Sequence, residues 1–477
     1  MSIDTQIDAF FAPISSAAFE VVLYSVPILG QDVKLLLVLM LSAALFFTFY
    51  LGFVNFKYFR HGIDVALGKY DDPKDDGRIN SFQALMASLS GTVGLGNIAG
   101  VAAAVTTGGA GAVFWMIMMG VLGMSTKFAE VTLGVKYRVH GSKKHPGKIS
   151  GGPMYYLRDG FAKRGFPLWG KVLGIFFAVC CIAGSIGGGN MFQANQLYQQ
   201  ALNVTGGEAG FLAGNAWIFG VALSALVGVV IIGGIRSIAN VASKIVPAMG
   251  VIYVGAGLVV LLMNYQAVPG AFSSIISEAF TLKAGLGGLL GGLLVGVQRA
   301  AFSNEAGLGT APVVYAAARA KHPVSQGMAS MIGPFLDTVV VCTMTALVIL
   351  TSGVYTQGDA LAGVELTSAA FATGLSWFPY VLTLAVFLFA YSTLITFSYY
   401  GVKCLTFIFG ENDRLETGFK IFYLLCTIVG CAAQFSSMID FTDAMFLSMA
   451  FPNIIGLYVF APEIKAELGD YLKKMKL

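Results

Sequence analysis

The stretch Ser90-Gly91-Thr92-Val93-Gly94-Leu95-Gly96-Asn97 decides the fold, and a second stretch, Ser303-Asn304-Glu305-Ala306-Gly307-Leu308-Gly309-Thr310, repeats its Gly-Leu-Gly. Each stretch interrupts a long apolar segment with glycines and polar side chains. A lipid-facing helix cannot leave backbone N–H and C=O groups unpaired, whereas a helix that lines a polar cavity can. Two such interruptions at corresponding places in the chain therefore predict a polar site inside a membrane protein.

The composition supports a membrane protein. Of the 477 residues, 56% are hydrophobic and only 11% are charged, which is more apolar surface than a soluble protein of this length can bury. Eleven apolar stretches are long enough to cross a hydrocarbon core of roughly 30 Å. The predicted spans are 34–54, 81–107, 111–135, 172–200, 212–234, 243–265, 285–318, 327–352, 378–402, 418–437 and 441–461.

The distribution of lysine and arginine tests this map independently. Alternate loops on one side of the spans hold 25 of the 29 basic residues. The opposite loops hold only Lys34 and Lys283, while Lys127 and Arg299 lie inside spans. Because cytoplasmic loops carry such an excess, we expect a multi-pass protein of the cell membrane with its N-terminus outside and its C-terminus in the cytoplasm. The net charge of +4 then reflects topology and not a nucleic-acid surface.

The spans divide the chain into an all-α polytopic arrangement of eleven transmembrane helices. Residues 1–33 form an extracytoplasmic segment, with 8–30 at the outer interface, and 34–56 form an extra N-terminal helix. Two five-helix repeats follow, 81–265 and 285–461, each beginning with an interrupted helix, and 462–477 form a cytoplasmic tail. Since five is odd, the repeats enter the bilayer from opposite sides, as in the inverted repeats of many secondary transporters.

The two interruptions offer different chemistry. Unwinding at Gly91–Gly96 would free carbonyls for a cation and start a new half-helix near Asn97, whose amides suit a carboxylate. Unwinding at Ser303–Gly307 would offer the C-terminal carbonyls of 285–301, which suit an ammonium group or a metal ion. The alternative is that the glycines serve only close helix packing, but packing alone does not need the polar side chains between them.

Several charged residues lie within the predicted spans. Lys127 and Glu130 are spaced three apart on one helix, which favours a local ion pair over a transport pathway. Arg299 and Glu305 flank the second interruption, and Asp337 lies in the 327–352 span. These three can form a gate or a structural network, and the sequence leaves both open.

Enzyme and channel functions have less support. Gly165–Val172 has most of a phosphate-loop spacing, but Val172 replaces the Ser or Thr that binds magnesium, so neither an enzyme nor an organic cofactor is expected. The six cysteines lack metal-binding spacing and are expected to be packing residues. A channel needs a continuous pore, usually between subunits, whereas two broken helices favour one occluded site for which a monomer suffices.

The motifs resemble those of one family. Thr92–Gly100, Gly108–Met116 and Phe302–Gly309 are similar to signature stretches of the alanine or glycine:cation symporters, also called sodium:alanine symporters. Gly188–Asn195 and Ser398–Gly401 add to a resemblance that runs from about 50 to 460. Val93–Asn97 also resembles a phrase of the neurotransmitter:sodium symporters, which implies a LeuT-type fold. Phe397 is a departure, since a tryptophan is common there in the family.

The resemblance implies sodium-coupled symport of alanine or glycine into the cell by alternating access, with another small amino acid or proton coupling as alternatives. It places the substrate between the broken helices. The implied substrate residues are Thr92, Gly94, Gly96, Asn97, Gln193, Phe302, Ser303, Asn304 and Phe397. The implied sodium ligands are Ser90, Val93, Ser392 and Thr393, all through oxygen, as a hard cation prefers.

Two of these assignments have structural alternatives. Gln193 can serve as an interhelical hydrogen bond, which is common for amides in membranes. Ser392 and Thr393 can bond back to the carbonyl four residues earlier on their own helix.

Overall fold

The computed structural model describes residues 24–28, 31–141, 148–281, 285–356, 361, 363–432 and 435–476, and it is helical almost throughout. Two short antiparallel hairpins interrupt the helices. The first pairs β1 (Ser25–Ile28) with β2 (Gln31–Lys34), and the second pairs β3 (Val139–His140) with β4 (Ile149–Ser150). The predicted interfacial segment 8–30 lies mostly outside the described residues.

The helices follow one another with short connections. Their bounds are α2 Leu35–Tyr50, α3 Val54–Lys57, α4 Phe59–Ala66, α5 Ser81–Thr92, η1 Leu95–Asn97, α6 Ala99–Lys136, α7 Pro153–Lys163, α8 Pro167–Ile186, η2 Gly187–Met191, α9 Phe192–Val204, η3 Gly207–Ala209, α10 Ala216–Ile231, α11 Gly234–Met263, η4 Tyr265–Ala267, α12 Val268–Ala279, α13 Gly285–Asn304, α14 Ala311–Tyr315, α15 Pro323–Ser330, α16 Ile332–Pro334, η5 Phe335–Cys342, α17 Thr343–Ser352, η6 Val354–Thr356, α18 Val364–Ala372, α19 Phe378–Phe409, α20 Asp413–Ala432, α21 Phe435–Ser448 and α22 Ala450–Met475.

Among the described residues, seven helices are long and apolar enough to cross a membrane. They are Leu95–Lys136, Pro167–Val204, Gly234–Met263, Pro323–Ser352, Phe378–Phe409, Asp413–Ala432 and Thr442–Met475. Two shorter apolar helices, α2 and α10, lie within the predicted spans 34–54 and 212–234. The polytopic membrane architecture is therefore confirmed, while the count of eleven and the division into two repeats stay predictions.

The first predicted interruption is a break in the helix. α5 ends at Thr92, Gly94 is extended, and a single 3₁₀ turn precedes α6. α6 itself is two helices, because Gly109 has φ 70° and ψ −178° in its interior. A straight helix of its 38 residues would be about 57 Å long, far more than one bilayer crossing needs. The bend at Gly109 thus separates the predicted spans 81–107 and 111–135.

The second interruption lies slightly later than predicted. α13 remains helical through Asn304, and positive φ angles follow at Glu305 (55°), Gly307 (96°) and Gly309 (83°). The short helix α14 then begins at Ala311. The expected unwinding at Ser303 is therefore wrong by two residues, because the left-handed positions that end the helix lie at and after Glu305.

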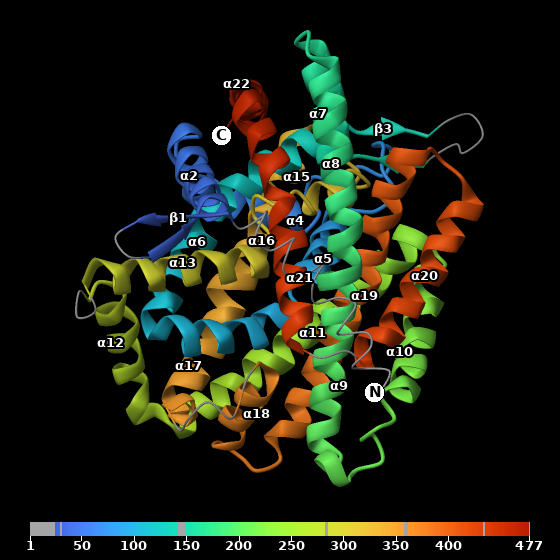
Figure 1. Cartoon of the computed structure of the whole chain (residues 1–477). Helices are drawn as coiled ribbons and strands as arrows, with labels where there is room; N and C mark the ends of the chain where they lie inside the picture. The colour runs from blue at the N-terminus through green and yellow to red at the C-terminus, as the bar shows by residue number, and fades with distance from the viewer. Residues whose placement is uncertain are drawn as a thin grey trace.

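Two π-helical segments widen the helices near the middle of the molecule. Figure 1 shows α8, η2 and α9 as one continuous rod, in which η2 is π-helical. The second such segment is η5, between α16 and α17. In the same view α7 and the C-terminal end of α22 project from one end of the molecule, and the end of α9 and α18 lie at the other. π segments inside α-helices often mark functional sites.

Candidate functional site

The first break is held by neutral side chains. Gly94 N donates to Asn97 Oδ1 (3.0 Å), and Leu95 N donates to Gln193 Oε1 (3.0 Å). The carbonyl of Asn97 accepts from the hydroxyl of Thr345 (2.8 Å). All of these residues are buried. The backbone groups freed by the break therefore find partners on α9 and α17, away from water.

Asn97 also contacts the second broken helix. Its Nδ2 donates to Ser303 Oγ (3.1 Å) and to Asp337 Oδ1 (2.7 Å). Ser303 Oγ donates in turn to Asp337 Oδ2 (2.5 Å), and Cys342 Sγ lies 3.1 Å from Ser303 Oγ. The two predicted breaks thus meet at one buried cluster of polar side chains.

Asp337 is the charged member of this cluster. It is fully buried and, among the described residues, takes part in no ion pair. Its position in η5 brings both its carboxylate and its carbonyl to Asn97 Nδ2, the carbonyl at 3.3 Å. Of the two roles left open for Asp337, a gate or a network, the geometry shows the network, because Asp337 accepts from Asn97, Ser303 and Thr338. A buried carboxylate between two broken helices can bind an ammonium group or a cation.

Gln193 bridges α9 to the first break. Its Nε2 donates to Gly188 O in η2 (3.0 Å), while its Oε1 accepts from Leu95 N. A Cβ at Gly94 would lie 3.1 Å from Gln193 Oε1 and 2.7 Å from Thr393 Oγ1. Glycine is therefore needed at position 94 for this close approach. Gln193 therefore forms the interhelical hydrogen bond that was the alternative to substrate binding. This hydrogen bond lies at the first break, on Leu95 N.

Aromatic rings surround one side of the breaks. A Cβ at Gly96 would lie 3.1 Å from the Phe302 ring, so Phe302 packs directly on the first break. Phe446 joins the two predicted pocket residues, because its ring centroid lies 5.2 Å from that of Phe302 and 5.4 Å from that of Phe397. Phe192 lies 5.8 Å from Phe302 on another side.

A small cavity of about 10 Å³ lies beside Phe302 and Phe192. Arg299 and Asp443 also line it and form an ion pair, with side chains only 14% and 3% exposed. Gln298 donates to the same Asp443 carboxylate (2.8 Å). Arg299 thus closes the cavity by pairing with α21, and it does not contact the unwound residues after Asn304.

Two of the predicted sodium ligands, Ser90 and Ser392, are in hydrogen-bond contact, and Thr393 Oγ1 approaches Gly94, the neighbour of Val93. Ser90 Oγ donates to Ser392 O (2.6 Å), and Thr396 Oγ1 donates to Ser90 Oγ (2.8 Å). Ser392 and Thr393 each donate to Phe389 O, both at 3.0 Å. The expected back-bonding to the carbonyl four residues earlier is therefore present for Thr393, whereas Ser392 bonds to the carbonyl three residues earlier, and both bonds add the Phe389 carbonyl to the oxygen cluster. All of these groups are hydroxyl or carbonyl oxygens, which suits a hard monovalent cation.

Two predicted substrate residues have other contacts. Thr92 Oγ1 makes only long hydrogen bonds to the preceding turn, 3.4 Å to Ser88 O and 3.5 Å to Leu89 O. Asn304 Nδ2 donates to Thr338 Oγ1 (3.0 Å), and its Oδ1 accepts from Ala306 N (2.9 Å). Among the described residues, no hydrogen bond joins Asn304 to the first break. Asn304 instead fastens the second break to η5.

Charged side chains hold the second break. Lys127 Nζ donates to the carbonyl of Glu305 (3.1 Å), and Glu130 Oε1 accepts from Gly309 N (3.0 Å). Asn453 Nδ2 donates to Glu130 Oε1 (2.6 Å) and to Gly307 O (2.8 Å). The Glu305 carboxylate accepts a short hydrogen bond from the Thr310 hydroxyl.

The expected pair between Lys127 and Glu130 is wrong. It does not occur among the ion pairs of the described residues. Each of the two side chains instead bonds to the unwound backbone, because buried N–H and C=O groups outside a helix must find a partner.

Several residues near the breaks were not identified from the sequence. The missed residues are Phe192, Thr338, Cys342, Thr345, Asp443, Phe446 and Asn453. For Asn453 and Asp443 a signal was available, since amide and acidic side chains inside or beside apolar spans usually have a specific partner. The remaining side chains are common in membrane helices, and only the packing of α9, η5, α17 and α21 brings them to the site.

Comparisons with known proteins agree on one family. Residues 18–477 match the profile of the Sodium:alanine symporter family. The chain is 39% identical to the sodium/alanine symporter AgcS of Methanococcus maripaludis over 91% of its length and 93% of that protein. It is 34% identical to the probable sodium/glutamine symporter GlnT of Bacillus subtilis, covering 93% of this chain and 89% of that one.

A solved structure shows the same fold. The crystal structure of MhsT in complex with L-phenylalanine superimposes with a TM-score of 0.54 and 16% sequence identity, covering 81% of this chain and 89% of that one. At this identity the likeness concerns the LeuT-type fold alone.

Proposed function

The chain belongs to the sodium:alanine symporter family, and from that premise we propose that it couples the entry of sodium to the uptake of alanine or glycine. The family and the fold are those of transporters. The observation that carries the proposal is the meeting of the two broken helices at Asn97, Ser303 and Asp337. A zwitterion needs an anionic group for its ammonium and a positive group for its carboxylate. This junction offers the Asp337 carboxylate and the positive N-terminal end of the half-helix that starts near Asn97.

The carboxylate end of the amino acid would bind at the first break. The 3₁₀ turn at Leu95–Asn97 and the start of α6 present backbone N–H groups at the positive end of a half-helix, which favours a negative charge. The ammonium end would bind at Asp337 and Ser303, where α13 also ends with its negative dipole end. Phe302 and Phe397 would enclose the side chain.

The size of the enclosed space favours the smallest amino acids. The cavity beside Phe302 measures about 10 Å³, which is at most the space for one water molecule, and large aromatic rings fill the volume around it. Any amino acid therefore requires Phe302 or Phe446 to move, and alanine and glycine require a smaller movement than glutamine. We therefore place alanine and glycine ahead of glutamine, which the name of GlnT associates with that relative.

Sodium would bind between the end of α5 and α19. Ser90, Val93, Ser392 and Thr393 supply the oxygens, and the ion would tie the first half of the broken helix to α19. Binding of the ion would order the first break and thereby strengthen amino-acid binding, and this coupling must be reciprocal. One sodium ion suffices energetically, because a tenfold gradient and 100 mV together support accumulation on the order of several hundredfold.

Alternating access would move one bundle against the other around this site. The eleven predicted spans, the two inverted repeats, the outside N-terminus and the cytoplasmic C-terminus belong to the same proposal. It rests on the alternation of basic loops and on the two breaks, and a monomer would be sufficient.

Uptake into proteoliposomes tests the proposal. Purified protein is reconstituted, and radiolabelled alanine, glycine, serine and glutamine are supplied with an inward gradient of sodium or of choline, with and without a pH gradient. We expect saturable alanine and glycine uptake that needs sodium and not the pH gradient. Uptake driven by the pH gradient in choline would show that protons and not sodium are the coupling ion. Conductance without accumulation of the amino acid would overturn symport.

A further inference from the structure

A second polar cavity lies far from the breaks, at the end of the molecule where the basic loops gather. It measures about 240 Å³ and is lined by residues that precede α5, by β4, by the junction of α10 and α11, and by the facing parts of α19 and α20. Five basic side chains line it against one acidic side chain, Glu416. The basic residues are Arg78, Lys148, Arg236, Lys403 and Lys420.

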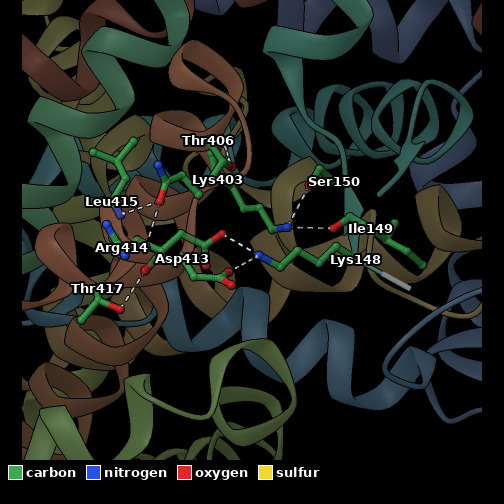
Figure 2. A network of polar contacts seen from close by, with 11 residues as sticks. Lys148, Ile149, Ser150, Lys403, Thr406, Asp413, Arg414, Leu415 and Thr417 are labelled. Carbon is green, nitrogen blue, oxygen red and sulfur yellow. Dashed lines mark hydrogen bonds and ion pairs between the residues drawn. The ribbon is translucent and has the colours of Figure 1, made fainter. Parts of the chain in front are cut away.

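Ion pairs neutralise only part of this charge. Lys148 Nζ lies 2.8 Å from Glu416 Oε1 and 3.1 Å from Asp413 Oδ1, so both nearby carboxylates are directed at one lysine (Figure 2). In the described part of the chain, Arg236, Lys403 and Lys420 form no ion pair within 4.0 Å. The cavity therefore keeps a surplus of positive charge after its own pairs are formed.

Lys403 is positioned without an ion pair in the described part of the chain, although Glu416 and Glu411 act on it at longer range. Figure 2 shows its side chain extending toward β4, where Nζ donates to Ile149 O (3.0 Å) and to Ser150 Oγ (2.8 Å). Neutral acceptors fix the direction of the ammonium group but leave its charge uncompensated. One more donor is available, because the buried hydroxyl of Tyr399 also lines the cavity and has no hydrogen-bond partner among the described residues.

The rim of the cavity is apolar and exposed. Ile232, between the lining residues Ile231 and Gly233, is 76% exposed, and Ile421, next to Lys420, is 56% exposed. Large apolar side chains exposed beside a charged pocket face the lipid in a membrane protein. Basic pockets between transmembrane helices on the cytoplasmic side commonly bind anionic head groups.

We propose that this cavity binds the phosphate group of an anionic phospholipid from the cytoplasmic leaflet. Arg236, Lys403 and Lys420 compensate its charge, Tyr399 donates a hydrogen bond, and the acyl chains lie along Ile232 and Ile421. Glu416 and Asp413 share Lys148 and keep one negative charge between them, and the charges of Arg236, Lys403 and Lys420 outweigh it. The bound lipid would link β4, α11, α19 and α20 at one point.

Native mass spectrometry of the full chain in detergent tests this site without measuring transport. Phosphatidylglycerol, phosphatidylcholine and inorganic phosphate are titrated separately. We expect phosphatidylglycerol to bind and phosphatidylcholine not to bind at equal concentration. If inorganic phosphate binds as tightly as phosphatidylglycerol, the cavity is a site for a soluble anion, and the proposal of a bound lipid is wrong.

Paired variants locate the binding. Arg236→Gln with Lys420→Gln should weaken phosphatidylglycerol binding by about 30-fold, since each basic side chain near an anionic membrane surface contributes about fivefold. The matched control, Lys171→Gln with Lys473→Gln, removes two exposed basic charges outside the cavity and should leave binding unchanged. Equal loss in both pairs would mean general charge attraction and no site.

A charge-conserving pair of substitutions distinguishes a lost binding site from a misfolded protein. Arg236→Lys with Lys420→Arg keeps the surplus charge and should retain binding within about threefold, by the same estimate of fivefold per charge. If this pair binds normally and the glutamine pair still shows wild-type affinity, the cavity is not the lipid site.

Discussion

The two breaks have the same glycine pattern but are stabilised by different chemistry. Around the first break, the freed backbone groups bond to amide and hydroxyl side chains on other helices, such as Gln193 and Thr345. Around the second break, Lys127 and Glu130 on α6 and Asn453 on α22 bond to the unwound backbone. Hydrogen bonds with ionised partners are roughly twice as strong as neutral ones.

This difference indicates a division of roles. Neutral hydrogen bonds can be exchanged for bonds to a ligand at little cost, so the first break can reorganise when sodium and the amino acid bind. Hydrogen bonds to charged side chains in a buried site are costly to break, so the second break should keep its conformation through the transport cycle. The experiments below test this division, first by comparing the two breaks directly and then by testing their junction, the sodium site and the far end of α22.

The largest effect is expected on the charged side. Glu130→Ala removes the acceptor of both Gly309 N and Asn453 Nδ2 and should lower the free energy of unfolding by about 3 kcal/mol, because each buried donor left unpaired costs about 1–3 kcal/mol. Thermal unfolding of the purified protein measures this. Gln193→Ala at the first break is the matched comparison and should cost less than half as much. Equal losses would remove the distinction between the breaks.

Asp337 tests the junction of the two breaks. Asp337→Asn keeps the size of the side chain but removes its charge, so alanine uptake should fall by about 100-fold while the thermal midpoint changes by only a few degrees. A hydrogen bond to a charged group contributes about 1.5–3 kcal/mol, which corresponds to that factor. The control Asp159→Asn, in a half-exposed pair with Arg158 on α7, should transport normally. Near-normal uptake by the Asp337 variant would exclude this carboxylate from the site.

Thr393 tests the sodium site at the first break. Thr393→Val removes one oxygen, so the sodium concentration for half-maximal uptake should rise by about tenfold, while the maximal rate at saturating sodium should change little. Thr351→Val is the control, because the Thr351 hydroxyl bonds back to Leu347 O and Val348 O within α17. A sodium dependence that is the same in both variants would place the ion elsewhere.

The smallest effect is expected at the far end of α22, the helix that carries Asn453. His61 Nε2 lies 2.9 Å from the hydroxyl of Tyr471, and burial lowers the pKa of His61, with Lys69 adding to this and Asp64 opposing it. The folded state therefore binds the proton less tightly than the unfolded state. The contribution of neutral His61 to the free energy of unfolding is therefore fully present above the ordinary histidine pKa of about 6.5, and it declines as the pH falls below that value.

Thermal unfolding at pH 7.5 and 5.5 measures this contribution. We expect wild-type protein to lose less than about 1 kcal/mol over this range through His61, and His61→Gln to lose less than wild type. Since Tyr471 and Asn453 lie on one helix, the loss should leave alanine affinity unchanged if the second break holds independently. An identical pH dependence in the variant would exclude His61 as its source.

The positions of the breaks could be predicted from the sequence, but their surroundings could not. Gly94 and Gly307 interrupt apolar segments visibly, because glycines and polar groups there have no role in a lipid-facing helix. The bend at Gly109 also lies between two predicted spans. The role of Asp337 was not predictable, since it depends on the π-helical geometry of η5, which has no simple sequence signal.

The error at Lys127 and Glu130 has a physical cause. A spacing of three residues places both side chains on one helix face, and this predicts a pair when water is the alternative partner. In the interior of this protein the alternative is an unwound backbone with unpaired groups, which competes successfully for both side chains. The second break began later than expected for a similar reason, because Asn304 still forms part of α13 while its side chain caps Ala306 N.

The π segment η2 makes the chain sensitive to length as well as to composition. A π-helical turn holds about one more residue than an α-helical turn, so η2 accommodates one extra residue within nearly the same rotation. Deleting one glycine from Gly187–Gly189 would let the rod become α-helical throughout and would leave the angular phase between α8 and α9 nearly unchanged. Deleting two glycines would rotate everything after them by about 100° relative to α8, and Gln193 would then face away from Leu95. A single deletion in this segment should therefore be far better tolerated than a double deletion.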